Sequence, residues 1–397
     1  MARTYLVGTA DTKGAELAFL RGLLAPLLPG LTLVDIGSRA PAIPVDIPAE
    51  IVAAHHPDGA GFLQGGDRGA VVAGMGAAFA AHCAAHAGGI DGILAIGGGG
   101  GTAMATAGMR ALPLGVPKVM VSTLASGDVA PYVDIADIMM VPAITDLAGL
   151  NRISRIVLHN AAQAFAGMMA RRPVPAPDDR PAIGLTMFGV TTPAVMAIAD
   201  ALRRDFDPLV FHATGTGGRA MEALADQGHF AGLLDVTTTE IADLLVGGVL
   251  AAAPSRLDVV ARTRIPWVGS LGALDMVNFW APGTVPERFR GRRLYHHNAN
   301  VTLMRTTPEE CALIGRWIGA KLNACEGEVR LLVPEGGLSA LDAPGAAFHD
   351  PQADAALFEA LRSTLDPTPR RRLVPLPHHI NDPAFAAAAV AALLEVL

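Results

Sequence analysis

The chain has 397 residues, more than one hydrophobic core usually spans, so two domains are expected. A net charge of -7, with charged residues at 17%, argues against nucleic acid or an anionic membrane as a partner, because both need a basic face. Only three cysteines occur, none in a CxxC spacing, and neither a signal peptide nor a membrane helix is predicted. The expected location is therefore the cytoplasm.

The first 170 residues alternate short apolar runs with longer amphipathic ones, the pattern of a parallel sheet covered by helices. We expect strands at TYLVG, LTLVDIG, GILAIGG and PKVMVST. Helices are expected from about residue 15, over about 70–87, from about 102 and over about 152–169. Residues 1–170 are thus predicted to form an α/β domain that binds a nucleotide.

The composition changes over residues 171–181, where proline and charge are concentrated as in a linker. Beyond it the alternation restarts. Strands are expected at AIGLTMFG, PLVFHATG, RIPWVGS and VRLLVP, and an alanine-rich helix from about residue 383. The predicted fold class is therefore α/β, with two Rossmann-like domains, over 1–170 and 182–397, each a mostly parallel sheet covered by helices.

The strongest local feature is a run of five glycines that follows the strand GILAIGG and precedes a helix. A backbone without side chains can curl so that several N–H groups point at one anion, and the helix dipole adds attraction. The run is neither a Walker A motif nor a dinucleotide fingerprint, and a turn without ligand is the alternative. The phosphate-binding residues predicted here are Gly97, Gly98, Gly99, Gly100, Gly101 and Thr102.

Two further strand ends should lie at the same edge of the sheet, where ligands of open α/β sheets collect. Lys13 suits a phosphate, and Asp11 suits magnesium or a ribose hydroxyl, although a helix N-cap is an equally common role for such residues. The nucleotide-binding residues predicted from these two turns are Gly8, Thr9, Asp11, Lys13, Ser122, Ser126, Gly127 and Asp128.

The second half offers another glycine-rich strand end, VFHATGTGG, which is a candidate site for a second ligand. The residues predicted to form that site are Thr214, Gly215, Thr216, Gly217, Gly218, Asn298 and Arg305. Candidate acid–base catalysts are His212, Glu335 and His379, although a lone histidine at a strand end is more often structural. Residues 237–240, TTTE, indicate a capping box that opens a helix.

Three pairs of neighbouring histidines invite a metal interpretation: His55-His56, His296-His297 and His378-His379. None of these pairs has a partner at the helical i, i+4 spacing, and the chain has no HExxH motif or cysteine cluster. No dedicated metal site is therefore predicted.

Taken in order, the stretches VGTADTKG, GGGGGT, STLASGD, VDIADI, GALDMVNFW and HINDP resemble the Tm-one-like ATP-binding family. The similarity runs from Thr4 to Phe385. This resemblance implies an ATP-binding N-terminal domain of Rossmann-like topology, a second α/β domain and a tendency to form a homodimer. It does not imply a particular reaction.

The leading hypothesis is an enzyme that binds ATP with magnesium and acts on a small anionic metabolite at the cleft between the domains. One alternative is a non-catalytic, nucleotide-dependent binding or regulatory module. Another is an ATP-independent hydrolase or lyase that uses His212 and the C-terminal histidines. The reaction and the substrate stay open at this point.

Overall fold

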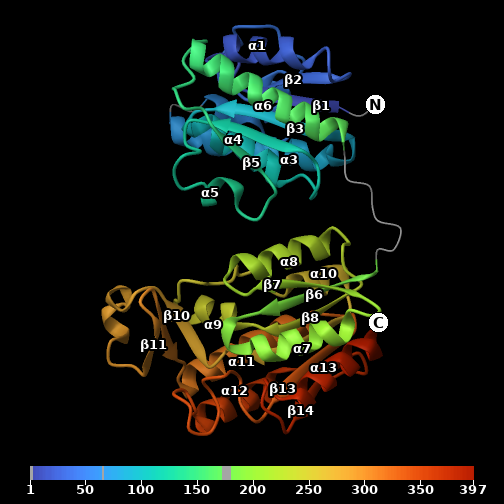
Figure 1. Cartoon of the computed structure of the whole chain (residues 1–397), viewed down its shortest axis with the longest axis vertical. Helices are drawn as coiled ribbons and strands as arrows, with labels where there is room; N and C mark the ends of the chain where they lie inside the picture. The colour runs from blue at the N-terminus through green and yellow to red at the C-terminus, as the bar shows by residue number, and fades with distance from the viewer. Residues whose placement is uncertain (1–2, 65–66, 172–179) are drawn as a thin grey trace. The chain divides into compact units, whose positions relative to one another are not determined.

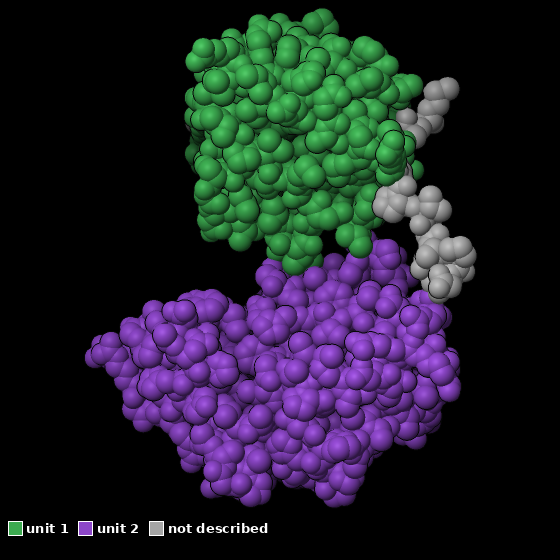
Figure 2. Space-filling view, in the orientation of Figure 1, with its two compact units in different colours: residues 1–175 green, residues 176–397 purple. Residues whose placement is uncertain are grey.

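The structure is a computed structural model that describes residues 3–64, 67–171 and 180–397. The chain divides into two compact units, residues 1–175 (unit 1) and 176–397 (unit 2), drawn in different colours in Figure 2. Most of the linker predicted over 171–181 lies outside the described residues. Each unit is built around its own sheet and its own hydrophobic clusters.

Unit 1 contains a five-stranded parallel sheet in the order β2-β1-β3-β4-β5 (Figure 1). Its strands are β1 (Arg3–Gly8), β2 (Leu31–Asp35), β3 (Ile90–Gly97), β4 (Lys118–Ser122) and β5 (Met139–Pro142). β2 pairs with β1 on one side, and the next strand in the chain, β3, pairs with β1 on its other side. This reversal between β1 and β3 is a topological switch point, where ligands of open α/β sheets bind.

The helices of unit 1 cover both faces of this sheet because side chains on a strand alternate between its faces. Tyr5 and Val7 pack with α2 (Ala49–Ala53), α3 (Arg68–Ala85) and α4 (Gly99–Arg110). Leu6, between them on β1, packs on the opposite face with α1 (Gly14–Leu24) and α6 (Arg152–Ala170). The remaining short helices are η1 (Ala60–Gln64), η2 (Ala87–Gly89) and α5 (Ala130–Val133).

Unit 2 contains a six-stranded parallel sheet in the order β14-β13-β9-β8-β6-β7. Its strands are β6 (Ala182–Met187), β7 (Asp207–His212), β8 (Gly232–Thr237), β9 (Trp267–Gly272), β13 (Val329–Pro334) and β14 (Arg371–Leu376). A second, antiparallel sheet is formed by β10 (Met276–Phe279), β11 (Leu294–Asn298) and β12 (Val301–Arg305), in the order β10-β12-β11.

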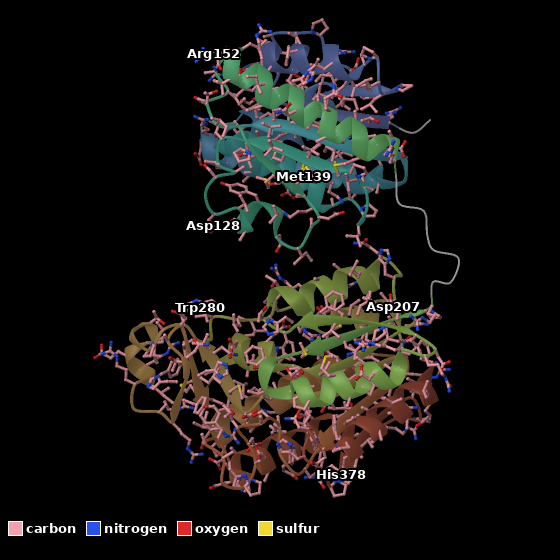
Figure 3. All side chains as sticks on the ribbon, viewed as in Figure 1. Asp128, Met139, Arg152, Asp207, Trp280 and His378 are labelled. Atoms are coloured by element: carbon pink, nitrogen blue, oxygen red, sulfur yellow. The ribbon has the colours of Figure 1, made fainter. Side chains whose placement is uncertain are left out.

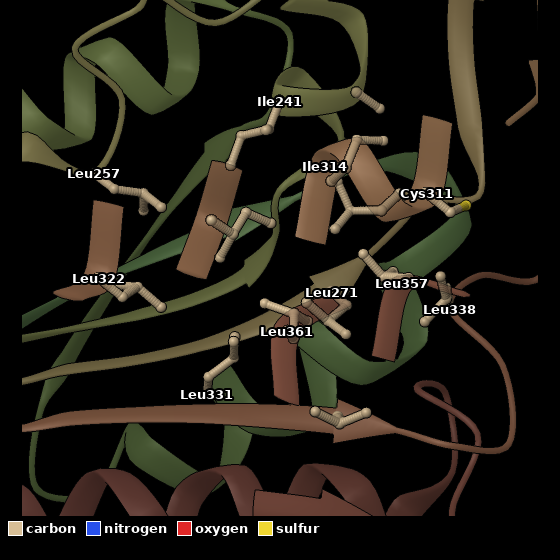
Figure 4. Close-up of a cluster of buried hydrophobic side chains, with 14 of the residues drawn as sticks. Ile241, Leu257, Leu271, Cys311, Ile314, Leu322, Leu331, Leu338, Leu357 and Leu361 are labelled. Atoms are coloured by element: carbon tan, nitrogen blue, oxygen red, sulfur yellow. The ribbon is translucent and has the colours of Figure 1, made fainter. Parts of the chain in front are cut away.

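Helices also cover both faces of the large sheet of unit 2. On one face lie α7 (Thr192–Leu202) and α13 (Pro383–Val396). On the other lie α8 (Thr216–Asp226), α9 (Thr239–Val246), α10 (Asp258–Thr263), α11 (Pro308–Asn323) and α12 (Pro351–Thr364). Figure 4 shows part of this second core, where Leu271 and Leu331 of the sheet meet Ile314 and Leu361 of the helices.

The predicted fold class is confirmed: both units are α/β, with parallel sheets covered by helices. The antiparallel sheet β10-β12-β11 was not predicted, and neither were the strands β5 and β8. Among the described residues, no helix combines the length and the apolar character that crossing a bilayer requires.

Candidate functional site

A cavity of about 540 Å³ lies in unit 1 at the carboxyl ends of β1, β2 and β3, and so at the switch point of the sheet. Its walls come from the turn after β1, the turn after β2, the start of α3 and the start of α4. The lining residues that the argument uses are Asp11, Lys13, Arg39, Arg68 and the glycines 98–101.

Glycine is needed in the five-residue run for two different structural reasons. Gly97 is buried, and a Cβ atom there would lie 2.7 Å from the backbone carbon of Gly101, so only glycine lets β3 approach α4 so closely. Gly99 and Gly100 instead border the cavity, where added Cβ atoms would lie at 3.6 Å from Leu124 and 3.3 Å from Val72. At these two positions glycine keeps the backbone amides accessible from the cavity.

The first turn of α4 offers hydrogen-bond donors to this cavity. The residue before the helix, Gly98, has no side chain that could cap it. The first amides of a helix have no partner within the helix, and they carry the positive end of its dipole. Gly98, Gly99, Gly100 and Gly101 all line the cavity. An anion is therefore the chemical partner that this turn fits.

Positive side chains surround the same space. Lys13, Arg39 and Arg68 all line the cavity, against one lining carboxylate, that of Asp11. The Lys13 ammonium donates a hydrogen bond to the carbonyl of Leu147, which holds it beside the turn after β1. Three cations near a helix start form a field that favours a ligand with several negative charges.

Two carboxyl groups meet at the end of the β1 and β2 strands. Asp35 Oδ1 accepts hydrogen bonds from Ala10 N at 2.9 Å and Gly37 N at 2.8 Å, while its Oδ2 is buried without a partner among the described residues. Asp11 Oδ1 is likewise buried and unpartnered within the described chain. A Cβ atom on Gly37 would lie 2.9 Å from Asp11 Oδ1 and 3.0 Å from Asp35 Oδ1, so both carboxylates approach one point.

Burial raises the pKa of Asp35, and the neighbouring charge of Asp11 raises it further. Unpartnered buried carboxylate oxygens are costly, and a hard divalent cation such as Mg²⁺ would satisfy them. Asp11 Oδ1 belongs to a residue that lines the cavity and therefore fits this ion, whereas Asp35 is 1% exposed, does not line the cavity and uses its Oδ1 to hold the turns after β1 and β2. Asp35 and Gly37 were not among the predicted residues. The available signal was an aspartate at the end of the strand LTLVD, in the same position relative to the sheet as the predicted turns.

Other residues predicted for this site do not line the cavity. Gly8 is buried beneath it, against Leu17. Thr102 and Ser122 are buried and hydrogen-bonded to each other at 2.7 Å, so their hydroxyls link α4 to β4. Ser126, Gly127 and Asp128 lie exposed in the loop between β4 and α5, where Asp128 accepts from Ala130 N at 3.0 Å (Figure 3).

The glycine-rich turn after β7 in unit 2 already has an anionic partner from the protein itself. Glu240 Oε1 accepts hydrogen bonds from Gly215 N at 2.8 Å and Gly218 N at 3.0 Å. The capping box expected at residues 237–240 is not formed, because α9 begins after Thr238, whose side chain makes no capping hydrogen bond. The amides that were expected to face a second ligand thus bind a buried carboxylate.

Glu240 belongs to a buried network of charges around Arg256, whose side chain is 1% exposed. The guanidinium contacts Glu222 and Asp235 at 2.8 Å each and Glu240 at 3.2 Å. Burial raises the pKa of Glu222, although Arg256 acts in the opposite direction. One buried arginine thus forms ion pairs with three buried acids. Removal of any member would leave buried charges without compensation, so the cluster has a structural role.

A second cavity, of about 560 Å³, lies in unit 2, and three of the predicted residues line it: His212, Thr214 and Asn298. Its walls are otherwise largely apolar or aromatic, and they include Phe188 and the half-exposed Trp280 (Figure 3). The rings of Phe188 and His212 stack with centroids 5.5 Å apart. This chemistry fits a partly apolar ligand that makes a few polar contacts.

The structure does not bring the other residues predicted for unit 2 to this cavity. Arg305 is 3% exposed and pairs with Asp354 at 2.7 Å. Glu335 pairs with Arg362 at 3.2 Å. His379 contacts the carbonyl of Ser339 at 2.8 Å through Nε2 and accepts from Asn381 N at 3.1 Å through Nδ1.

His212 and His379 follow strands at opposite edges of the six-stranded sheet. Five strand spacings separate β7 from β14, which is roughly 24 Å. The two imidazoles therefore do not act on one substrate atom within unit 2.

Comparisons with known proteins cover the whole chain. The family model described as the N-terminal domain of the uncharacterised protein family UPF0261 matches residues 2–173, and the model of its C-terminal domain matches residues 180–397. A UPF0261 protein of Mesorhizobium japonicum is 61% identical over 100% of this chain and 99% of its own length. One of Clostridium tetani is 42% identical over 99% of this chain and 98% of its own length. The ToMV resistance protein Tm-1 of Solanum lycopersicum is 40% identical over 99% of this chain and 56% of its own length.

Proposed function

This chain belongs to the UPF0261 family, and on that premise we propose that it is an ATP-binding protein whose nucleotide site is the cavity at the switch point of unit 1. One observation carries the proposal: the uncapped, all-glycine start of α4 and three cationic side chains line the same cavity. The volume of about 540 Å³ lies within the range of small-molecule sites.

Each group has a role in this proposal. The amides of Gly99, Gly100 and Gly101 bind phosphate oxygens, and Lys13, Arg39 and Arg68 neutralise them. Asp11, the one lining carboxylate, would hold Mg²⁺ together with phosphate oxygens, and the ion would supply further charge neutralisation. The apolar part of the lining packs against the base and consists of Ile36, Leu63, Val71, Val72 and Met104.

Titration calorimetry of the whole chain with Mg-ATP, Mg-ADP and AMP tests the proposal. Because the cations and amides act on phosphate, we expect affinity to fall in the order ATP, ADP, AMP. Binding to the folded chain should also raise its melting temperature. If no nucleotide gives heat or a melting shift at several millimolar, the proposal fails. Equal affinity for ATP and AMP would show that the glycine turn does not bind the phosphates that AMP lacks.

We further propose that the chain is an enzyme, with a small anionic metabolite as the second reactant. Release of phosphate from ATP that depends on a particular small acid would support this. The rival is a nucleotide-dependent binding or regulatory module, which predicts tight ATP binding without turnover against a panel of such acids.

A second candidate function belongs to the cavity around His212, since its aromatic walls and few polar groups form a separate small-molecule site. The matched variants are His212→Ala, which alters this cavity, and His379→Ala, which does not. A ligand found by screening the whole chain should lose affinity only with the first variant. Loss with His379→Ala alone, in a folded protein, would contradict the assignment.

We also propose a cytoplasmic location and a homodimeric assembly. Cys83, Cys311 and Cys325 are all buried free thiols, which supports a reducing, cytoplasmic environment. A homodimer is proposed from the family resemblance, and light scattering of the purified chain measures it. A mass equal to one chain at micromolar concentration would contradict the dimer.

A further inference from the structure

Three histidines gather at the opposite end of unit 1 from the nucleotide cavity. His55 follows α2, while His82 and His86 are four residues apart at the end of α3. Residues four apart share one face of a helix, and α2 packs on α3. Beside them is a shallow cavity lined by Arg3 and Tyr5 at the start of β1 and by Gly89 before β3. The cluster therefore lies at the amino ends of the strands.

The three imidazoles lie close enough to share one ion. One ring nitrogen of each lies within 4.8 Å of those of the other two. The ring centroids of His82 lie 4.6 Å from His55 and 4.5 Å from His86. A tetrahedral zinc ion with bonds of about 2.0–2.1 Å holds its ligand nitrogens about 3.4 Å apart. Small side-chain rotations supply that difference, because His55 and His86 are at least partly exposed.

Each imidazole is already oriented by a second contact through one ring nitrogen. His55 Nδ1 contacts the carbonyl of Ile51 at 3.0 Å, and His86 Nδ1 contacts the carbonyl of His82 at 2.8 Å. His82 Nε2 lies 3.2 Å from the hydroxyl of Tyr5. Metal-bound histidines characteristically use their other nitrogen in this way, which fixes the tautomer and the ring plane. One nitrogen on each ring stays outside these contacts.

The second ring nitrogen of His82, Nδ1, is an independent indication of a bound ligand. His82 is 3% exposed, and its buried Nδ1 has no hydrogen-bond partner among the described residues. A buried polar atom without a partner costs about 1–3 kcal/mol. In the tautomer whose Nε2 donates to the Tyr5 hydroxyl, Nδ1 carries a lone pair, and a cation bound at Nδ1 would select that tautomer.

We propose that His55, His82 and His86 form a binding site for a divalent first-row transition ion, with Zn²⁺ as its resident. Three imidazoles suit such ions, and three protein ligands leave a fourth position for water. That position would face the shallow cavity beside Arg3 and His86. Cys83 is fully buried next to His82 and packs in the core of unit 1, so the ligand set is nitrogen only.

The test uses the whole chain, stripped with EDTA, dialysed and titrated with ZnCl₂ in the presence of a chromophoric chelator. We expect one Zn²⁺ per chain. His55→Ala and His86→Ala should each weaken binding at least about 100-fold, since loss of even an outer-shell partner costs 10–100-fold. Both replacements fall on exposed or half-exposed side chains, so the fold should survive, and circular dichroism checks this.

His56→Ala is the matched control, because its ring packs on Phe62 and its Nδ1 accepts from Asp58 N, outside the cluster. It should bind Zn²⁺ as the unaltered chain does. Co²⁺ loading supplies a second readout: the strong visible absorption of a four-coordinate ion should appear and be lost with His55→Ala. Less than one bound Zn²⁺ per chain would overturn the proposal. So would full binding that persists in both His55→Ala and His86→Ala.

Discussion

Glu240 Oε1 accepts a hydrogen bond of 2.8 Å from the backbone amide of Gly215, at the turn that follows β7. The turn after β3 has the same sequence pattern of a strand, several glycines and a helix, but there Gly98 leads into α4 without a capping side chain. One turn therefore carries its own anion, while the other lines a cavity with cations around it. This difference is the reason for proposing the turn after β3, and not the turn after β7, as the phosphate site.

The first prediction concerns that internal anion. Glu240→Ala should destabilise unit 2 by at least about 3 kcal/mol, because Arg256 Nε and the amides of Gly215 and Gly218, three buried donors, lose their acceptor at about 1–3 kcal/mol each. Urea unfolding followed by tryptophan fluorescence measures this in the whole chain, since all three tryptophans lie in unit 2. Glu326→Ala, which breaks an exposed pair with Arg264, is the control and should change stability by about 0.5 kcal/mol or less. Equal effects of both replacements would refute the structural role of Glu240.

The second prediction separates the glycines of the β3 turn. Gly99→Val and Gly100→Val should each weaken ATP binding about tenfold or more, about 1.4 kcal/mol, because a branched side chain would crowd the α4 amides, beside Val72 of the cavity wall at Gly100 and beside Leu124 at Gly99. Gly97→Ala should instead lower the melting temperature of unit 1, since its Cβ would meet backbone at 2.7 Å. Calorimetry and thermal melts on the three variants distinguish the effects. Normal ATP affinity in both valine variants would make the turn structural only.

The third prediction concerns magnesium. Asp11→Asn should reduce the gain in ATP affinity that Mg²⁺ brings, because a carboxylate oxygen available to the ion is lost. Titrations of ATP with magnesium and with EDTA measure that gain. Asp128→Asn is the control, as Asp128 lies in an exposed loop outside the cavity and should leave the gain intact. An undiminished magnesium effect in Asp11→Asn would place the ion elsewhere.

The fourth prediction concerns pH and the buried acids around Arg305. Burial raises the pKa values of Asp275 and Asp342 to about 6 and that of Asp354 to about 7. Their ordinary value is near 4, so between about pH 4 and 7 the folded chain holds more protons than the unfolded chain. The free energy of unfolding of unit 2 should therefore fall as pH rises through this window and level off above it.

Asp342→Asn tests the origin of that slope, since Asp342 Oδ2 accepts from Leu338 N while its Oδ1 accepts no hydrogen bond from the described residues and lies 3.8 Å from the Arg305 guanidinium. The amide oxygen of an asparagine can still accept the hydrogen bond from Leu338 N, but the residue no longer adds a negative charge beside Asp275 and Asp354. Urea unfolding at pH 5 and pH 7.5, followed by tryptophan fluorescence, should show a smaller difference than in the unaltered chain. An unchanged difference would assign the slope to other groups.

The sequence predicted most of the parallel strands, because burial on both faces produces apolar runs, although it missed the short β5 and the fully buried β8. It missed β10, β11 and β12, whose segments MVNF, LYHHN and VTLMR are short and mix polar with apolar residues. Their pairing comes from contacts between segments distant in sequence, such as Asn278 with Leu303. Local patterns do not contain that information.

Asp11, Lys13 and the glycines 98–101, which the sequence predicted for the site, line one cavity, since they lie in turns that follow strands of the same sheet. The sequence could not distinguish Gly97 from Gly99, because the difference lies in how closely β3 approaches α4. It could not foresee that Glu240 folds back onto a turn 22 to 25 residues earlier. The same holds for His55, which meets two histidines of α3 only through the packing of α2.

Helix α3 has 18 residues, a length of about 27 Å, and it touches both proposed sites of unit 1. Its first turns supply Arg68 and Val72 to the nucleotide cavity, its last turn supplies His82, and His86 is its C-cap. Two ligands that bind to residues of the same helix need not bind independently of each other. If zinc changes the affinity for ATP by some factor, ATP must change the affinity for zinc by the same factor. A zinc titration with and without nucleotide would therefore measure whether α3 transmits binding along its length.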